Sequence, residues 1–470
     1  MPTMQTHAKN TSRWFLDHWY LLFICLVLVM RVFFWFSPSH AEKINMIYLW
    51  PMAITATSLV VVQRRMLLSF RFALPGAMAL WLFVSCVVNG DPYLVYNRTF
   101  MLGIILSFLS FFLVTPSLPP EKRENGFRWL ASLYCLLMVG MASLGLYVAL
   151  TGQSIRTPLS DEAIRISINR LFFLHYHPNE AGSALVIALY LLLYLFASWC
   201  GVAKRLLLAL AGLVTALAIA LTGSRTSVLL AALGVGVLVF WAIYTHLFGK
   251  RKWLRWPVGL AALAGVTVAL YLALSFSVGF VATLAQHSAA QVPPPAVTDG
   301  QPAEPAPQAA TPPQNVVRMD DSRVQMQDIG TFNMRVEIWQ TGLDYMKAHP
   351  RAYLFGVPDN IVARIPQAAG RQEMHMHNAY LEMFLLGGVP GIALYAIFLL
   401  LLAYSGLTLA FRRTSGLGTR FLAFVPLLIA VNGITEIYPL FSGNVMDMMY
   451  FAIAGTVLSL AGNSLPRIRR

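Results

Sequence analysis

Residues 180–199 have the sequence EAGSALVIALYLLLYLFASW, which carries no charged side chain after its first residue. An apolar stretch of about 20 residues is the length that an α-helix needs to cross the hydrocarbon core of a membrane. Similar stretches recur along almost the whole chain, without the alternating segments of about ten residues that are typical of a transmembrane β-barrel. The sequence therefore predicts an all-α integral membrane protein.

The composition supports this fold class. The chain has 470 residues, of which 57% are hydrophobic and 11% are charged. Because a soluble domain has about 25% charged residues, this chain has too few polar side chains to cover a water-soluble surface. A cytosolic enzyme, a disordered protein and a fibrous protein are excluded.

About twelve transmembrane helices are predicted from the boundaries of the apolar stretches. Helices 1–9 fall within residues 1–282, a large outer loop covers residues 283–378, and helices 10–12 fall within residues 379–470. The predicted spans are 19–36, 44–62, 72–90, 94–115, 127–150, 180–199, 205–222, 226–247, 256–282, 379–411, 421–437 and 445–462.

The net charge of +14 is explained by membrane topology. Lysines and arginines cluster in every second connection, starting with the N-terminal segment, and cytoplasmic loops of membrane proteins carry such an excess. This alternation predicts that both termini are cytoplasmic, and it disfavours nucleic acid as the partner. The clustered residues are Lys9, Arg13, Arg64, Arg65, Arg71, Lys122, Arg123, Arg128, Lys204, Arg205, Lys250, Arg251, Lys252, Arg255, Arg412, Arg413, Arg420, Arg467, Arg469 and Arg470.

Two outer connections are long, residues 151–179 and residues 283–378. Within the second, the Pro-rich segment 292–314 is typical of a flexible, extended linker, and its role is open. Apolar residues at helical spacing over residues 333–348 predict a short amphipathic helix that Pro350 ends. This helix either packs on the bundle or lies in the lipid interface.

Charged residues at the outer ends of the predicted spans indicate a functional site there. Charges in or near hydrocarbon are costly, and they favour a functional role by default. Snorkelling and helix capping are the alternatives for each residue taken singly, whereas a transporter would place polar groups near the bilayer midplane. The residues are Arg31, Arg98, Glu180, Arg225, Glu382, Glu436 and Asp447.

Three polar clusters occur on the same outer side. They are Arg170 with His175-Tyr-His177-Pro-Asn179, then Thr222-Gly-Ser-Arg225-Thr-Ser227, then His375-Met-His377-Asn378. The two His-x-His pairs are compatible with metal binding, but a site needs further ligands that the spacing does not supply, so no metal site is predicted. Arginine offers a planar fork of donors that suits phosphate, which indicates an anionic phosphate ligand.

His377-Asn378, nine residues and then Gly388-Val-Pro-Gly391 resemble the HN-x9-GxxG signature of bacterial O-antigen ligases. The segments around Arg225 and Asn179, and Arg335-Val-Glu-Ile-Trp339, are also similar to that family. The resemblance implies a GT-C-like glycosyltransferase architecture with a large periplasmic loop carrying short helices. O-antigen polymerases and pilin-glycosylating ligases share most of these motifs.

The resemblance implies transfer of polysaccharide from undecaprenyl pyrophosphate to a sugar hydroxyl of lipid A–core, at the periplasmic face of a Gram-negative inner membrane. His377 is the expected general base, because a neutral histidine accepts the proton of a weak nucleophile. Arg225 and Arg335 are expected to stabilise the diphosphate, in an inverting displacement without metal or cofactor. The residues expected to bind substrate are Arg170, His177, Asn179, Asn378, Arg98 and Arg31.

Two other functions remain open at this point. An O-antigen polymerase or a protein-glycosylating ligase would use the same donor with another acceptor, and a transporter of lipid-linked glycan would use the arginines as a phosphate vestibule. The Gly388/Gly391 pair has two interpretations as well, a bend in the helix or close helix packing. We expect packing, with a local kink at Pro390.

Overall fold

The structure is a computed structural model of the chain. It describes residues 24–29, 32, 69–89, 98–156, 163–167, 170–173, 178–246, 253–290, 329–357, 362, 376–436 and 445–462. Apart from residues 24–29 and 32, the first two predicted spans lie outside the described residues, as does the Pro-rich segment 292–314.

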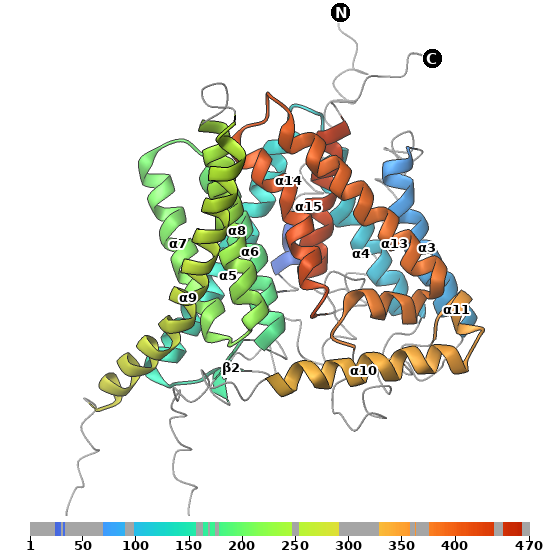
Figure 1. The fold of residues 1–470 in the computed structure, drawn as a ribbon, viewed down its shortest axis with the longest axis horizontal. Helices are drawn as coiled ribbons and strands as arrows, with labels where there is room; N and C mark the ends of the chain where they lie inside the picture. Colours follow the sequence, from blue (N-terminus) through green and yellow to red (C-terminus); the bar gives the residue numbers. More distant parts are fainter. Residues whose placement is uncertain are drawn as a thin grey trace, which may run out of the picture.

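A helix occupies each of the ten remaining predicted spans (Figure 1). Among the described residues, eight helices are long and apolar enough to cross a membrane, and residues Ile105–Ser117 and Leu417–Asn432 form shorter apolar helices. The prediction of an all-α integral membrane protein is confirmed. The helices are α3 (Phe70–Asn89), α4 (Arg98–Ser117), α5 (Arg123–Thr151), α6 (Pro178–Ser198), α7 (Val202–Leu221), α8 (Arg225–His246), α9 (Arg255–Ala290), α13 (Ala379–Phe411), α14 (Leu417–Asn432) and α15 (Val445–Gly462).

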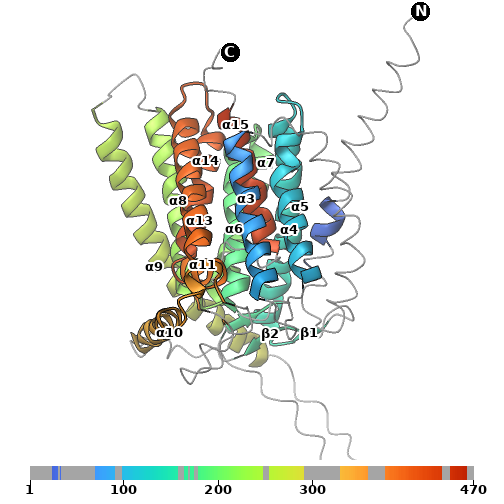
Figure 2. The same ribbon diagram turned by 90° about the vertical axis from the view of Figure 1, so that its right-hand side faces the viewer.

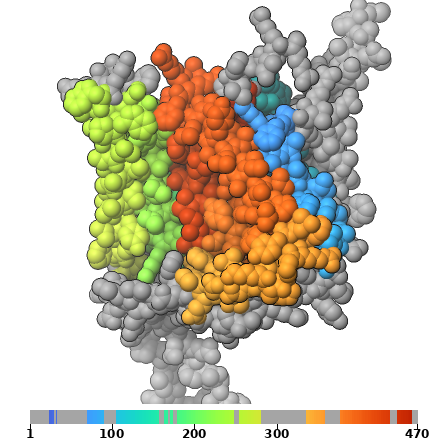
Figure 3. Space-filling view, turned by 45° about the vertical axis from the view of Figure 1, so that its right-hand side comes forward, coloured from blue at the N-terminus to red at the C-terminus, as the bar shows by residue number. Residues whose placement is uncertain are grey.

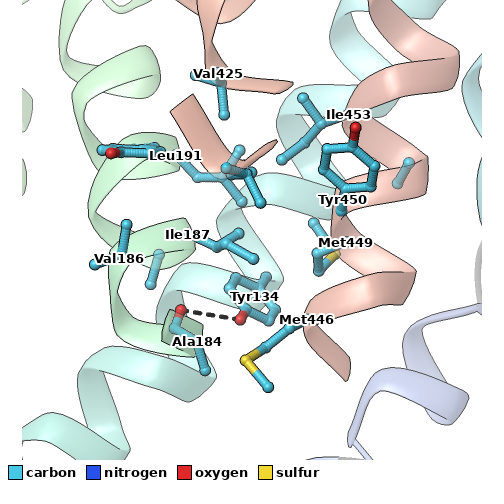
Figure 4. Close-up of a cluster of buried hydrophobic side chains, with 14 of the residues drawn as sticks. Tyr134, Ala184, Val186, Ile187, Leu191, Val425, Met446, Met449, Tyr450 and Ile453 are labelled. Carbon is cyan, nitrogen blue, oxygen red and sulfur yellow. Dashed lines mark hydrogen bonds between the residues drawn. The ribbon is translucent and has the colours of Figure 1, made fainter. Parts of the chain in front are cut away.

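Helices α6 and α15 form the centre of the bundle, where both are buried on nearly all sides. Helix α9, at the edge in Figure 2, has almost no buried residues over Arg255–Gly279. Figure 4 shows the central packing, in which Ile187 of α6 faces Met446 and Tyr450 of α15, and Tyr134 of α5 donates a hydrogen bond of 3.0 Å to the carbonyl of Ala184. A helix that is apolar all round is either buried or lipid-facing, and this chain contains both kinds.

Helix α10 (Ile329–Ala348) and the short helix α11 (Ala352–Phe355) lie across one end of the bundle, which we call the site end. Figures 1 and 2 show α10 nearly perpendicular to the long helices, and Figure 3 shows this segment covering the ends of α3 and α13. Buried Ile338 and Met346 of α10 share a hydrophobic cluster with Leu385 of α13. Of the two alternatives for the predicted amphipathic helix, the structure shows packing on the bundle.

Helix α13 bends at Gly388, which has φ 63°, and not at Pro390 as predicted. Pro390 contributes to this bend, because it lacks the N–H that would otherwise donate a hydrogen bond to the Leu386 carbonyl. The Ser85 hydroxyl of α3 donates to this carbonyl at 2.6 Å, and Trp81 Nε1 donates to the carbonyl of Gly387 at 2.7 Å. The expected close packing is present too, since a Cβ on Gly388 would lie 2.6 Å from the Tyr353 carbonyl oxygen.

A small antiparallel sheet between α5 and α6 was not predicted. Its strands are β1 (Ile155–Arg156), β2 (Ala163–Ser167) and β3 (Arg170–Phe172), in the order β1-β2-β3. The fully buried side chains of Ile164 and Leu171 belong to the same hydrophobic core as α5. The sheet lies at the site end, close to the start of α6 (Figure 1).

Candidate active site

Glu436 is a buried carboxylate in the turn that follows α14. The prediction carried this helix to residue 437, but it ends at Asn432, and the backbone amides of Thr435 and Glu436 then both donate to the Asn432 carbonyl. The Ala379 amide at the start of α13 donates to the Glu436 carbonyl at 2.9 Å. These backbone bonds fix the turn against α13, with 3% of Glu436 exposed.

Three elements bring polar side chains to this carboxylate. Asn179, in the first turn of α6, donates from Nδ2 to Oε1 at 2.8 Å, and Nη2 of Arg335 on α10 lies 3.3 Å from the same oxygen. The other oxygen, Oε2, lies 3.4 Å from Nδ1 of His377. We call Glu436, Asn179, Arg335, His377 and Arg170 the site network.

Arg170 joins the network from strand β3. Its Nη2 donates to Oδ1 of Asn179 at 2.5 Å, and its Nε donates to the carbonyl of Thr222 at 2.7 Å. Thr222 follows the last residue of α7, where helix carbonyls lack intrahelical partners and favour a cation. Gly223, with φ 66°, permits the close approach, because a Cβ there would lie 3.2 Å from Nε of Arg170.

His377 has a strained backbone. Among the described residues other than glycine, it alone has a positive φ, at 50°. Its neighbours hold this conformation: Trp339 Nε1 donates to the Met376 carbonyl at 2.8 Å, and the Met376 amide donates to Oε2 of Glu382 at 2.9 Å. Backbone strain that the surroundings enforce in this way is frequent at functional sites.

Asn378 caps helix α13. Its Oδ1 accepts hydrogen bonds from the amides of Tyr380 and Leu381 at 3.0 and 2.9 Å, and its Nδ2 donates to the Ile434 carbonyl at 3.1 Å. Asn378 thus links the start of α13 to the turn that carries Glu436. Its contacts position His377, and the predicted role in substrate binding stays a prediction.

Arg225 is the first residue of α8 and is exposed. Its neighbour Thr226 accepts a hydrogen bond of 3.1 Å from the hydroxyl of Thr435, which directly precedes Glu436. The start of α8 therefore lies beside the turn that carries the central carboxylate, on the rim of the site network.

The remaining predicted residues are not placed by the structure. Arg98 begins α4, but its side chain is not described, and Arg31, His177 and His375 lie outside the described residues. In the described part of the chain, no group of three or more His, Cys, Asp or Glu side chains is arranged to hold a metal ion. The expectation that Arg31, Arg98 and His177 bind substrate stays a prediction.

The role of Glu436 was missed by the sequence analysis, which noted the residue only as a charge at the end of a span. Its partners Asn179 and Arg335 are 257 and 101 residues away in the chain. The available signal was its acidic side chain at the outer end of an apolar helix, among several arginines on the same side. This pattern indicates an anionic centre that is surrounded by basic side chains.

The geometry suits two chemical tasks. A carboxylate beside Nδ1 of His377 favours the tautomer with the proton on Nδ1, which leaves Nε2 as a proton acceptor. The His377 side chain is 12% exposed, so the ring is held in place and still reachable. Arg335, whose side chain is 22% exposed, presents a guanidinium beside it that suits phosphate oxygens.

Comparison with known protein families identifies the central part of the chain. Residues 210–396 match the family model described as O-antigen ligase. This region contains Arg225, Arg335 and His377, while Arg170, Asn179 and Glu436 lie outside it. No curated protein matches the chain. The chain therefore carries an O-antigen ligase domain over residues 210–396, and this match supports its assignment to the O-antigen ligase family.

Proposed function

We propose that this protein is an O-antigen ligase, which transfers polysaccharide from undecaprenyl pyrophosphate to a sugar hydroxyl of lipid A–core. The observation that carries the proposal is the site network, in which one buried carboxylate joins His377 and Arg335 at one end of a membrane helix bundle. The O-antigen ligase domain supports this choice among the chemistries that such a site could perform.

In this proposal, His377 accepts the proton of the attacking hydroxyl. The acceptor oxygen forms a bond to the anomeric carbon of the donor sugar, and the bond from that carbon to the diphosphate oxygen breaks with its electron pair moving to the diphosphate. A single displacement of this kind inverts the anomeric centre and needs no covalent enzyme intermediate. Glu436 keeps the imidazole in the productive tautomer and stabilises the imidazolium as it forms.

Arg335 and Arg225 stabilise the charge that grows on the leaving diphosphate. Fixed cationic donors aimed at developing charge lower the barrier because they need no reorganisation during the reaction. Arg335 is held by Glu436 at 3.3 Å with part of its side chain exposed, so an arriving diphosphate meets a guanidinium that is already in place. These arginines perform the task for which other transferases use a divalent cation.

The proposed location is a Gram-negative inner membrane, with the site end in the periplasm. The connections between α4 and α5, between α6 and α7 and between α13 and α14 lie at the opposite end of the bundle (Figure 1). Lys122, Lys204, Arg205, Arg412 and Arg413 lie in these connections or within a few residues of them, and connections with such an excess of basic residues are typically cytoplasmic. Arg31, Arg98 and His177 complete the proposed substrate contacts on the periplasmic side.

The test is transfer by purified protein in detergent, with an undecaprenyl-diphosphate-linked glycan, lipopolysaccharide that lacks O-antigen, and excess EDTA. We expect high-mass lipopolysaccharide from the wild type and none from Arg225→Ala. Glycan that lengthens on the donor lipid would indicate a polymerase instead. If no covalent product forms, transport of the lipid-linked glycan into vesicles becomes the function to measure.

A further inference from the structure

A closed ring of hydrogen bonds joins α14 to α6 next to the site network. The backbone amide of Glu436 donates to the carbonyl of Asn432 at 3.0 Å, and Nδ2 of Asn432 donates to Oγ of Ser183 at 2.9 Å. The Ser183 hydroxyl donates in turn to the carbonyl of Asn179 at 2.9 Å, and Nδ2 of Asn179 donates to the Glu436 carboxylate at 2.8 Å. We call Glu436, Asn432, Ser183 and Asn179 the hydrogen-bond ring.

The hydrogen-bond ring lies inside the protein, since each of its four residues is between 3% and 9% exposed. Ser183 follows Asn179 by one turn of α6, and Asn432 is the last residue of α14. The ring therefore ties the end of one helix to the start of the other. Glu436 is held at two points, through its amide by Asn432 and through its carboxylate by Asn179. Connected hydrogen bonds in a low-dielectric interior strengthen one another.

The side chain of Asn432 is costly at this position. Because the Ser183 hydroxyl donates to Asn179, it accepts from Asn432, which assigns Nδ2 to this bond. Oδ1 of Asn432 has no hydrogen-bond partner among the described residues. The small cavity that Asn432 lines has mostly apolar walls, such as Val186, besides Ser183 and Asp447. A buried polar atom without a partner lowers stability, so an apolar side chain of similar size would serve the fold at least as well.

We propose that Asn432 and Ser183 are positioning residues, which hold the carboxylate of Glu436 in register with His377. This proposal rests on the proposed ligase function. Oε2 of Glu436 lies 3.4 Å from Nδ1 of His377, which is longer than a typical hydrogen bond. Any further shift of the carboxylate away from the imidazole weakens its hold on the ring. Outer partners that orient a functional side chain in this way affect the reaction without touching the substrate.

The experiment measures kcat and the KM values for donor and acceptor in Asn432→Leu and Ser183→Ala, each alone and combined with Glu436→Gln. For the single variants, we expect kcat to fall about three- to tenfold, the range of one neutral hydrogen bond, with both KM values unchanged. In the Glu436→Gln background, we expect no further fall, because groups that act as a unit are not additive. The control is Ser459→Ala, which removes a buried hydroxyl that donates to Thr456 of its own helix and should keep the wild-type kcat.

Thermal unfolding separates positioning from a merely structural role. We expect Asn432→Leu to unfold at the wild-type temperature or above it, because leucine removes the buried Oδ1, while its kcat falls. A loss of stability together with activity in this variant overturns the proposal. So does an unchanged kcat in both single variants, or an equal fall of kcat with and without Glu436→Gln. If the wild type itself transfers no glycan, the proposed ligase function fails, and the positioning role fails with it.

Discussion

Nδ1 of His377 lies 3.4 Å from a carboxylate oxygen of Glu436, although 59 residues separate the two in the chain. The contact exists because the start of α13 lies against the turn that follows α14. The backbone amide of Ala379 donates a hydrogen bond to the carbonyl of Glu436 there. A histidine oriented by a buried carboxylate is a common arrangement of a general base. The proposed general base therefore depends on Glu436 as much as on the imidazole of His377.

Replacing Glu436 by Gln tests this dependence. The amide is nearly isosteric, but it removes the negative charge that fixes the tautomer of His377 and balances its positive form. We expect kcat to fall on the order of 10²–10⁴-fold, by analogy with the buried acid of a catalytic triad. The measurement is the transfer rate at saturating donor and acceptor.

The matched control is Asp344→Asn, on the outer side of α10. There, hydrogen bonds from Lys347 and Gln340 lower the pKa of the exposed Asp344 carboxyl, so this residue is also an anion, but it lies away from the site network. The control should keep the wild-type rate. Equal rates for Glu436→Gln and the control would remove Glu436 from the mechanism.

Asn179→Ala should destabilise the protein. Asn179 accepts from Arg170 and donates to Glu436 in a buried position, and its loss leaves each of these ionic groups with one partner fewer. A buried polar group that loses a partner costs about 1–3 kcal/mol. We expect a lower thermal unfolding temperature in detergent. Ser143→Ala, which removes an exposed hydroxyl on α5 that bonds its own helix, should leave it unchanged, and equal shifts in the two variants would contradict the buried role of Asn179.

Gly388→Ala should disrupt the junction between α13 and α11. The positive φ strains any side chain there, and the new Cβ would lie 2.6 and 2.7 Å from the carbonyl oxygens of Tyr353 and Leu354. Strain of this kind costs roughly 1–3 kcal/mol before the steric clash is counted. Gly140→Ala is the control, since a Cβ at Gly140 meets nothing within 4 Å and alanine favours a helix. A lower thermal unfolding temperature for Gly140→Ala than for Gly388→Ala would contradict the kinked geometry.

Chelation should leave transfer intact. The proposal assigns the diphosphate charge to Arg225 and Arg335, so excess EDTA is expected to change the rate less than twofold, a difference of under about 0.4 kcal/mol in the barrier. The rate is measured before and after dialysis against the chelator. Loss of activity that zinc or magnesium restores would contradict a metal-independent reaction.

The transmembrane helices were predictable because the bilayer fixes their length and polarity. Helix α13 has the predicted bounds of 379–411, and α15 those of 445–462. The end of α14 was misplaced, because the predicted span followed the apolar residues to 437 and passed over Asn432-Gly433, a pair that is typical of a helix end. The three short strands were missed, although Ala163-Ile-Arg-Ile-Ser alternates in polarity as a strand does.

The sequence drew attention to single residues of the candidate site, but not to the contacts between them. Resemblance to the motifs of O-antigen ligases drew attention to His377, Arg225 and Arg335, and all three lie within the matched residues 210–396. Glu436 and the bond from Arg170 to Asn179 follow from packing between elements that are distant in the sequence, which periodicity and spacing do not encode. Asn378 was expected to contact substrate, whereas its described hydrogen bonds cap α13 and contact Ile434.

The most direct test of the account is the transfer rate of His377→Gln beside that of His349→Gln. His349 is an exposed histidine that follows α10 and stacks on Tyr345, so it controls for the loss of a histidine outside the site network. We expect His377→Gln to bind the donor as the wild type does and to transfer about 10²–10⁴-fold more slowly, while His349→Gln retains the wild-type rate. Transfer by His377→Gln at the wild-type rate would contradict the assignment of His377 as the general base.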